Sequence, residues 1–238
     1  MVEAVQRWRI AFRRGTPALD LGPPEIARAW EAGLVSAGIP IMMSATATPR
    51  PRLTFAAPLP AGRIAEHDLA DFVLSERWPL PRLRPVLVAA LPPGFELVDL
   101  YDVWLGSPAI TAALSAIGSR VTVAGTGPAQ LGAAVSTVLA SERLERTRPK
   151  AGGSVAYDLR PLILGLETAT QAPADSPTRE SEQAIVRMIL KSSPDGPSGR
   201  PDEVILALGE AAGHELIQVE LVRERLWTAD ELPTLHPG

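Results

Sequence analysis

Arginine is the residue type in this sequence whose spacing best suits ligand binding. The stretch RWRIAFR (7–13) alternates charged and apolar residues. A period of two predicts a strand with Arg7, Arg9 and Arg13 on the face opposite the apolar side chains. Guanidinium groups suit phosphates and stacked bases, so this face could bind an RNA backbone in a salt-sensitive way. The alternative is a solvated strand face that opposes acidic neighbours such as Asp71.

A second arginine pair lies in TATPRPRLTF (46–55). Pro49 and Pro51 restrict the residues that precede them to extended conformations. Arg50 and Arg52 are then presented at a low cost in conformational entropy. The pattern predicts a rigid corner that faces a ligand and leads into a strand.

The segment DLRPLI (158–163) places two ionisable residues in an apolar strand. Asp158 and Arg160 are two residues apart, so both lie on the same strand face. In one interpretation Asp158 orients Arg160 towards an anionic ligand, together with Arg148 and Lys150 across the preceding turn. In the other, the two form a structural ion pair at a sheet edge or between two units.

The composition argues against several kinds of chemistry. The chain has no cysteine and three histidines, which excludes disulfides, thiolate metal sites and cysteine nucleophiles. No Ser-His-Asp arrangement, nucleophile elbow or zinc-hydrolase helix is present, and the acidic cluster around His67 is typical of surface charge. We therefore expect no metal, no cofactor and no independent enzymatic activity.

Charge is spread unevenly along the 238 residues, whose formal net charge is -4. Residues 1–65 hold eight arginines against four acids, whereas residues 151–238 hold seven basic residues against fourteen acids. The N-terminal part is thus the more suitable for a polyanion. No long apolar run and no signal-peptide pattern is present, so we expect a cytoplasmic protein with no membrane partner.

The elements that must position these residues follow a repeated order. Hydrophobic periodicity predicts strands at 8–14, 52–59, 68–77 and 95–105, with helices at 22–40 and 79–94. It then predicts strands at 119–125, 153–169, 181–193 and 214–227, with helices at 127–143 and 199–212. The order βαββαβ therefore occurs twice.

This order predicts an α+β protein made of tandem ferredoxin-like two-layer sandwiches with antiparallel sheets. The units are expected at 1–112 and 113–238, the second with a flexible C-terminal tail. Each unit covers one sheet face with helices and leaves the other for solvent, a second sheet or a ligand. Aromatic residues that would stack RNA bases on that open face are missing from the predicted strands.

Three segments resemble a known family. The stretch AGIPIMMSATATPRPRLTFAAPLPAG (37–62) is similar to the signature of the bacterial radical-SAM-linked domain of unknown function, the DUF2344 family, in which "AGLP" precedes a serine, "GFNPHPK", "ISFA", "PL" and a glycine. RTRPKAGGSVAYDLRPLI (146–163) resembles its basic "KGG-VDLRPLI" segment and GRPDEVILALG (199–209) its "RPDEVL-AL" segment. The matching residues of the first segment are Ala37, Gly38, Pro40, Ser44, Pro49, Pro51, Arg52, Phe55, Pro58, Leu59 and Gly62.

Departures from the family pattern fall on its polar residues. Gly22 and Pro23 stand where the family has Ser-His, and Arg50 stands where it has the histidine of "GFNPHPK". The chain therefore resembles a divergent, stand-alone member. The resemblance implies association with a radical-SAM enzyme, and the fold by analogy implies RNA modification or ribosome-related work.

Two functional hypotheses follow. The first is an accessory protein that binds tRNA or rRNA through an arginine-rich surface. The second is a protein adaptor that docks on a radical-SAM enzyme with no nucleic-acid or catalytic role. Both would use the same candidate residues, which are Arg7, Arg9, Arg13, Arg28, Arg50, Arg52, Arg148, Lys150, Asp158 and Arg160.

Overall fold

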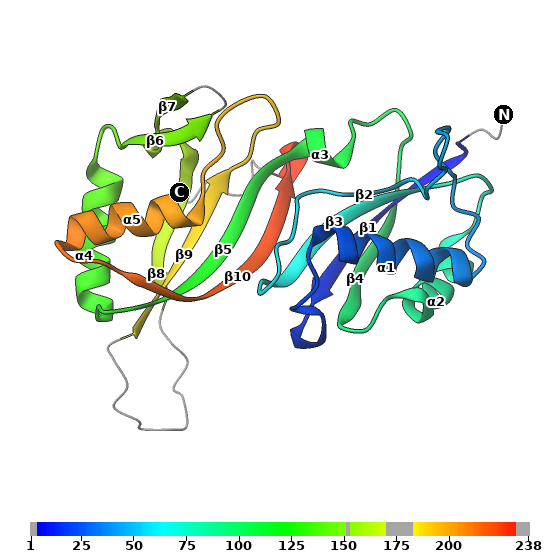
Figure 1. Cartoon of the computed structure of the whole chain (residues 1–238), viewed down its shortest axis with the longest axis horizontal. Coiled ribbons are helices and arrows are strands. Elements are labelled where there is room, and N and C mark those ends of the chain that lie inside the picture. The colour runs from blue at the N-terminus through cyan, green and yellow to red at the C-terminus, as the bar shows by residue number, and fades with distance from the viewer. Residues whose placement is uncertain (1–3, 151–152, 170–182, 232–238) are drawn as a thin grey trace. The chain divides into compact units, whose positions relative to one another are not determined.

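The computed structural model describes residues 4–150, 153–169 and 183–231. The chain divides into two compact units, Met1–Leu114 with Arg223–Gly238, and Ser115–Val222 (Figure 1). Both units mix helices with mostly antiparallel strands. The expected division after residue 112 lies close to Leu114, but the chain from Arg223 onward belongs to the first unit.

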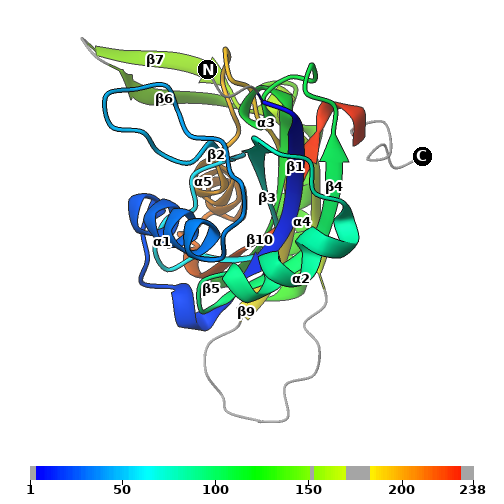
Figure 2. The same ribbon diagram turned by 90° about the vertical axis from the view of Figure 1, so that its right-hand side faces the viewer.

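The first unit is built on strand β1 (Gln6–Arg14). β1 pairs in antiparallel register with β3 (Ile64–Leu74) and β4 (Phe95–Val103), and the short β2 (Leu53–Phe55) pairs antiparallel with β3. The strand order is β4-β1-β3, with β2 on β3 and with β10 (Ile217–Thr228) also next to β3. The helices are α1 (Pro23–Ser36), α2 (Leu80–Ala90) and α3 (Ile110–Ala113), with a 3-10 turn at Thr16–Ala18 (Figure 2).

The core of the first unit confirms the periodicity of the sequence. On α1, Ile26, Trp30 and Leu34 recur at every fourth position and all three are buried, as expected for one face of a helix. The Trp30 ring lies 4.9 Å from Phe12 of β1 between ring centroids and packs edge-on against Phe55 and Phe95. The alternate apolar residues of β1 thus face the helices.

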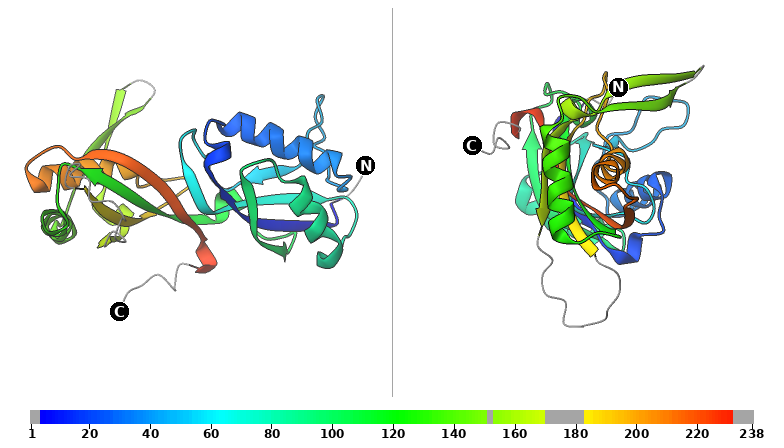
Figure 3. Two further views of the ribbon diagram at one scale, coloured as in Figure 1. Left: turned by 90° about the horizontal axis from the view of Figure 1, so that it is seen from below. Right: turned by 90° about the vertical axis from the view of Figure 1, so that its left-hand side faces the viewer.

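The second unit repeats the strand order of the first. Its sheet runs β10-β5-β9-β8, with β5 (Leu114–Ala124), β8 (Ile163–Ala169) and β9 (Gln183–Lys191). Helices α4 (Pro128–Ala140) and α5 (Pro201–Ala212) pack on each other, and α4 contacts β8 and β9 (Figure 3). Four strands can be compared in each unit: β1 to β4 in the first, and β5, β8, β9 and β10 in the second. When they are numbered in chain order within their unit, their order across the sheet is 4-1-3-2 in both.

One element of the second unit differs from the sequence prediction. Residues 153–169, expected as a single strand, form β7 (Gly153–Asp158), a 3-10 turn (Arg160–Leu162) and β8. β7 pairs with β6 (Glu145–Lys150), which was not predicted, in a separate two-stranded sheet that projects from the unit (Figure 3). Pro161 lacks a backbone donor and lies in the turn, where the strand ladder stops.

In the described part of the chain, no helix combines the length and the apolar character needed to cross a bilayer.

Candidate nucleic-acid interface

The β6–β7 hairpin carries basic residues at alternate positions of one strand. Arg146 lies opposite Tyr157 and Arg148 opposite Val155. Because side chains alternate across a strand, these four residues share one face of the hairpin. The side chain of Lys150, two positions further along β6, lies outside the described residues.

Arg146 anchors the hairpin to helix α5. Its guanidinium lies 2.7 Å from the Glu210 carboxylate and 3.7 Å from that of Glu203, and the Arg146 side chain is 11% exposed. A lone two-stranded hairpin is marginally stable in water, so this anchor helps to keep it folded. The contact also offsets one of the two negative charges that would otherwise repel an anion.

Arg148 is the half-buried arginine of the same face. The Cζ atom of Arg148 lies 5.2 Å from the centroid of the Tyr157 ring, which is a cation–π distance. Burial, followed by the charge of Glu203, raises the pKa of the Tyr157 hydroxyl, so it stays a neutral donor. Arg200, the exposed N-cap residue of α5, also acts electrostatically on Tyr157. The guanidinium of Arg148 and the phenol of Tyr157 therefore lie together on this face.

Asp158 and Arg160 do not form the pair that the sequence suggested. The Asp158 carboxylate accepts hydrogen bonds from the backbone N–H groups of Leu144 (2.8 Å) and Arg160 (3.0 Å). These bonds, with the Leu144 contribution first, lower the pKa of Asp158. The Arg160 guanidinium donates to the carbonyls of Leu139 at the end of α4 and of Ile163. Both side chains satisfy backbone groups, so the interpretation that Asp158 aims Arg160 at a ligand is corrected.

Arg7 and Arg9 of β1 are buried, which corrects the expectation that they line an open sheet face. They are 8% and 7% exposed. Arg9 makes a bidentate pair with Asp71 at 2.7 and 3.0 Å, and Arg7 donates to the backbone carbonyls of Trp104 and Ser107. The alternative interpretation was a solvated face opposite Asp71. The contact with Asp71 is observed for Arg9 and, at 3.8 Å, for Arg7, but both arginines are buried rather than solvated.

The other predicted arginines of the first unit are exposed but lie in different settings. Arg28 pairs with Glu25 at 2.6 Å, and Arg50 makes three contacts of 2.8 to 3.1 Å with the Glu31 carboxylate of α1. Arg52 contacts the Met42 sulfur at 3.3 Å. Arg13 is exposed near the end of β1.

The loop that carries the arginine–proline alternation is ordered by hydroxyl groups. The Ser44 hydroxyl accepts the backbone N–H of Arg50, and the Thr46 hydroxyl donates to the Thr48 carbonyl. Met43 pairs with Pro51 in an isolated bridge. The corner is thus held in place, but it directs Arg50 to Glu31 of the same unit.

Two charged side chains are buried against expectation: the sequence analysis overlooked Arg14, and it wrongly assigned Asp68, in the acidic cluster around His67, to surface charge. Arg14 is fully buried, and its guanidinium donates to five backbone carbonyls, those of Ala18, Leu19, Leu21, Leu59 and Pro60. Asp68 is 1% exposed and accepts from Arg223 at 2.9 and 3.3 Å. Burial raises the pKa of Asp68, against the opposing effect of Arg223. The phase of Arg14 with Ile10 and Phe12 was the available signal for a buried arginine.

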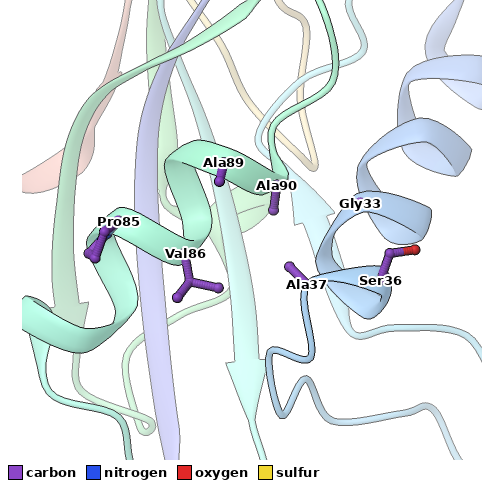
Figure 4. Close-up of a pocket in the computed structure, with 7 residues that line it drawn as sticks. All are labelled: Gly33, Ser36, Ala37, Pro85, Val86, Ala89 and Ala90. Atoms are coloured by element: carbon purple, nitrogen blue, oxygen red, sulfur yellow. The ribbon is translucent and has the colours of Figure 1, made fainter.

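Neither a metal site nor an anion-binding groove is evident in the features described next. No group of three His, Cys, Asp or Glu residues within the described ranges could hold a metal ion. A shallow groove of about 630 Å³ separates the C-terminal parts of α1 and α2 (Figure 4). Its lining is small, uncharged and mostly apolar, consisting of Gly33, Ser36, Ala37, Pro85, Val86, Ala89 and Ala90. Such a lining suits no anion.

Residues 7–201 match the model of a family described as "Uncharacterized protein conserved in bacteria (DUF2344)". The chain belongs to this family. The three segments that carried the resemblance all begin within the matched range. Two of them, 146–163 and 199–209, are in contact in this DUF2344 chain through Arg146 and Glu203. No curated protein sequence matches the chain.

Solved structures show similarity at the level of fold. A chain of a Cbf5-Nop10-Gar1 complex aligns with a TM-score of 0.50 and 10% identity over 93% of this chain and 51% of its own length. A chain of the archaeal box H/ACA sRNP Nop10-Cbf5 complex gives 0.45 and 8%, over 90% and 46%. An unknown protein from Galdieria sulphuraria gives 0.25 and 15%, over 90% and 98%. The DUF2344 chain thus spans about half the length of the first two.

Proposed function

We propose that this chain is a cytoplasmic, non-catalytic protein that binds tRNA or rRNA through the β6–β7 hairpin. The observation that carries the proposal is the guanidinium of Arg148 over the Tyr157 ring on a hairpin that projects from its unit. Guanidinium groups held on an aromatic face bind phosphate and stack on bases.

The arrangement of charge around the hairpin supports this proposal. Arg146 forms the ion pairs with Glu203 and Glu210, and Arg148 and Arg200 do not pair with these acids. Neither Arg148 nor Arg200 forms an ion pair with a described residue. Contacts of this kind position a nucleic-acid backbone without reading its sequence.

The proposal also includes a partner enzyme and a fold. The resemblance of segments 37–62, 146–163 and 199–209 to the radical-SAM-linked domain supports a stand-alone accessory to a radical-SAM enzyme. The shared strand order 4-1-3-2 supports two ferredoxin-like units in tandem. An adaptor role on an acidic protein surface would use the same hairpin arginines.

Salt-dependent RNA binding tests the proposal. The dissociation constants of the full chain for bulk tRNA and for rRNA would be measured by filter retention between 50 and 200 mM salt. We expect the double variant Arg148→Ala, Lys150→Ala to weaken binding and to flatten the log–log salt slope by roughly 1.4 to 1.8, which is the effect of two lost phosphate contacts.

The control is Arg28→Ala, which removes an exposed arginine that is already paired with Glu25. It should leave the RNA affinity and the salt slope unchanged. If neither RNA is retained at 50 mM salt, or if the hairpin variant binds as tightly as the wild type, the proposed function is wrong.

A further inference from the structure

The loop that follows β4 presents an unusually exposed tryptophan. Trp104 is 78% exposed, the highest value among the large apolar side chains that the structure describes, whereas Trp8, Trp30 and Trp78 are 7% exposed or less. Tyr101, three positions before it, and Leu105, which follows it, are 38% and 41% exposed. Exposed aromatic clusters of this kind are characteristic of interaction surfaces.

A buried arginine holds this loop in place. The Nη2 atom of Arg7 donates to the Trp104 carbonyl at 2.9 Å and to the Ser107 carbonyl at 3.0 Å. The Ser107 N–H also donates to the Trp104 carbonyl at 3.0 Å, which closes the turn. Arg7 is therefore a positioning residue, and the backbone that carries the indole is fixed from inside the unit.

The indole itself lies along the turn. A Cβ atom at Gly106 would come within 2.5 Å of the Trp104 ring, so the ring packs directly against the Gly106 backbone. The remaining surface of the ring faces solvent, because the side chain is 78% exposed. A preorganised aromatic of this kind loses little conformational entropy when a partner covers it.

The charge around the loop identifies the class of partner. Residues 85–119 contain no lysine or arginine and three acids. Glu96 lies opposite the exposed Arg13 of β1, whereas Asp99 and Asp102 are nearer the loop and lie opposite the uncharged Ala11 and Trp8. All three acids are exposed on β4. They would repel the phosphates of a nucleic acid, whereas they complement lysine and arginine on a protein surface.

We propose that Trp104, with Tyr101 and Leu105, is the docking site for a protein partner that offers an apolar pocket bordered by lysine or arginine. This inference does not rest on the proposed RNA binding, because it concerns a different surface with the opposite charge. It also differs from the adaptor role at the hairpin, which would require an acidic partner surface.

Site-specific photo-cross-linking in the native cell tests the inference. A benzophenone amino acid at position 105 should form an adduct with one protein, and the cross-linked peptide should lie beside lysine or arginine. The same probe at Leu164 of β8, which has the same exposure of 41%, should not form this adduct.

The identified protein is then purified and titrated with the full chain. Trp104→Ala should weaken binding about 30-fold, as expected for an interface hot spot, and Trp104→Phe should restore part of the loss. Asp99→Asn should reduce the salt dependence. The melting temperature of each variant would show that it is folded, because Trp104 is not part of the core.

Four results would overturn the inference. These are an adduct with RNA, an adduct with a second copy of this chain, no adduct at position 105, or a purified partner whose affinity is unchanged by Trp104→Ala. Each of them leaves the hairpin test of RNA binding unaffected, so the two proposals fail separately.

Discussion

Strand β1 of the first unit and the β6–β7 hairpin of the second both carry arginine at alternate positions, and the structure uses them differently. Arg7 and Arg9 are buried and bound to Trp104, Ser107 and Asp71. Arg148 lies over Tyr157 on a projecting hairpin. Alternation of residue types therefore defines the two faces of a strand, whereas loops and neighbouring strands determine which face remains accessible.

The largest expected difference between the two regions is in stability. Arg9→Ala removes the bidentate partner of the Asp71 carboxylate, itself 5% exposed, and leaves it only the longer 3.8 Å contact with Arg7. Breaking a buried ion pair in this way costs about 3 to 5 kcal/mol. Chemical denaturation should therefore show a large loss in the free energy of unfolding.

The matched variant is Arg13→Ala, on the same strand but exposed. It should change the free energy of unfolding by less than about 0.5 kcal/mol, as should Arg148→Ala on the hairpin. Equal losses for Arg9→Ala and Arg13→Ala would mean that the buried face of β1 is not formed.

A smaller and local effect is expected at the hairpin anchor. Arg146→Ala removes the contacts with Glu203 and Glu210, which are worth about 1 kcal/mol in a partly exposed site. Amide hydrogen exchange in residues 145–148 and 153–158 should accelerate roughly fivefold, with little change in the melting temperature. Unchanged exchange would show that the hairpin is held by other contacts.

The pH dependence of the first unit gives the smallest effect. Burial, followed by the charge of Arg225, lowers the pKa of His67. The unfolded chain therefore takes up a proton first as the pH falls below about 6.5, and the stability present above that pH is progressively lost. The loss is at most about 1.4 kcal/mol per pH unit for one proton.

The measurement uses tryptophan fluorescence, because all five tryptophans belong to the first unit. The free energy of unfolding of the wild type should fall between pH 7 and pH 5.5, and that of His67→Gln should fall less. A wild type and a variant with the same pH profile would contradict the role given to His67.

Much of the fold could be predicted from the sequence because apolar periodicity reports local structure directly. Helices α1, α4 and α5 and strands β1, β4 and β9 lie at the expected positions. The β6–β7 hairpin was missed because ERTRPK is polar and contains a proline, so its strand is recognised only through its pairing with β7. Pro161, which has no backbone N–H, is the sequence signal for the break between β7 and β8.

The candidate site was harder to predict because it depends on contacts distant in sequence. Nothing near Arg7 indicates that it will bind carbonyls about 100 positions away, and nothing near Arg50 indicates Glu31. Arg148 was identified from its charge, whereas its partner Tyr157 required the hairpin register. Arg14 was overlooked although its phase with Phe12 placed it on the apolar face.

Hydrogen exchange with and without bound tRNA tests the central claim most directly, because it reports on both regions in one experiment. At low salt and saturating tRNA, we predict slower exchange in residues 145–148 and 153–158 of the hairpin. The exposed 44–50 loop of the first unit, which holds the ion-paired Arg50, should exchange at an unchanged rate. Protection of the 44–50 loop with no protection of the hairpin would contradict the account.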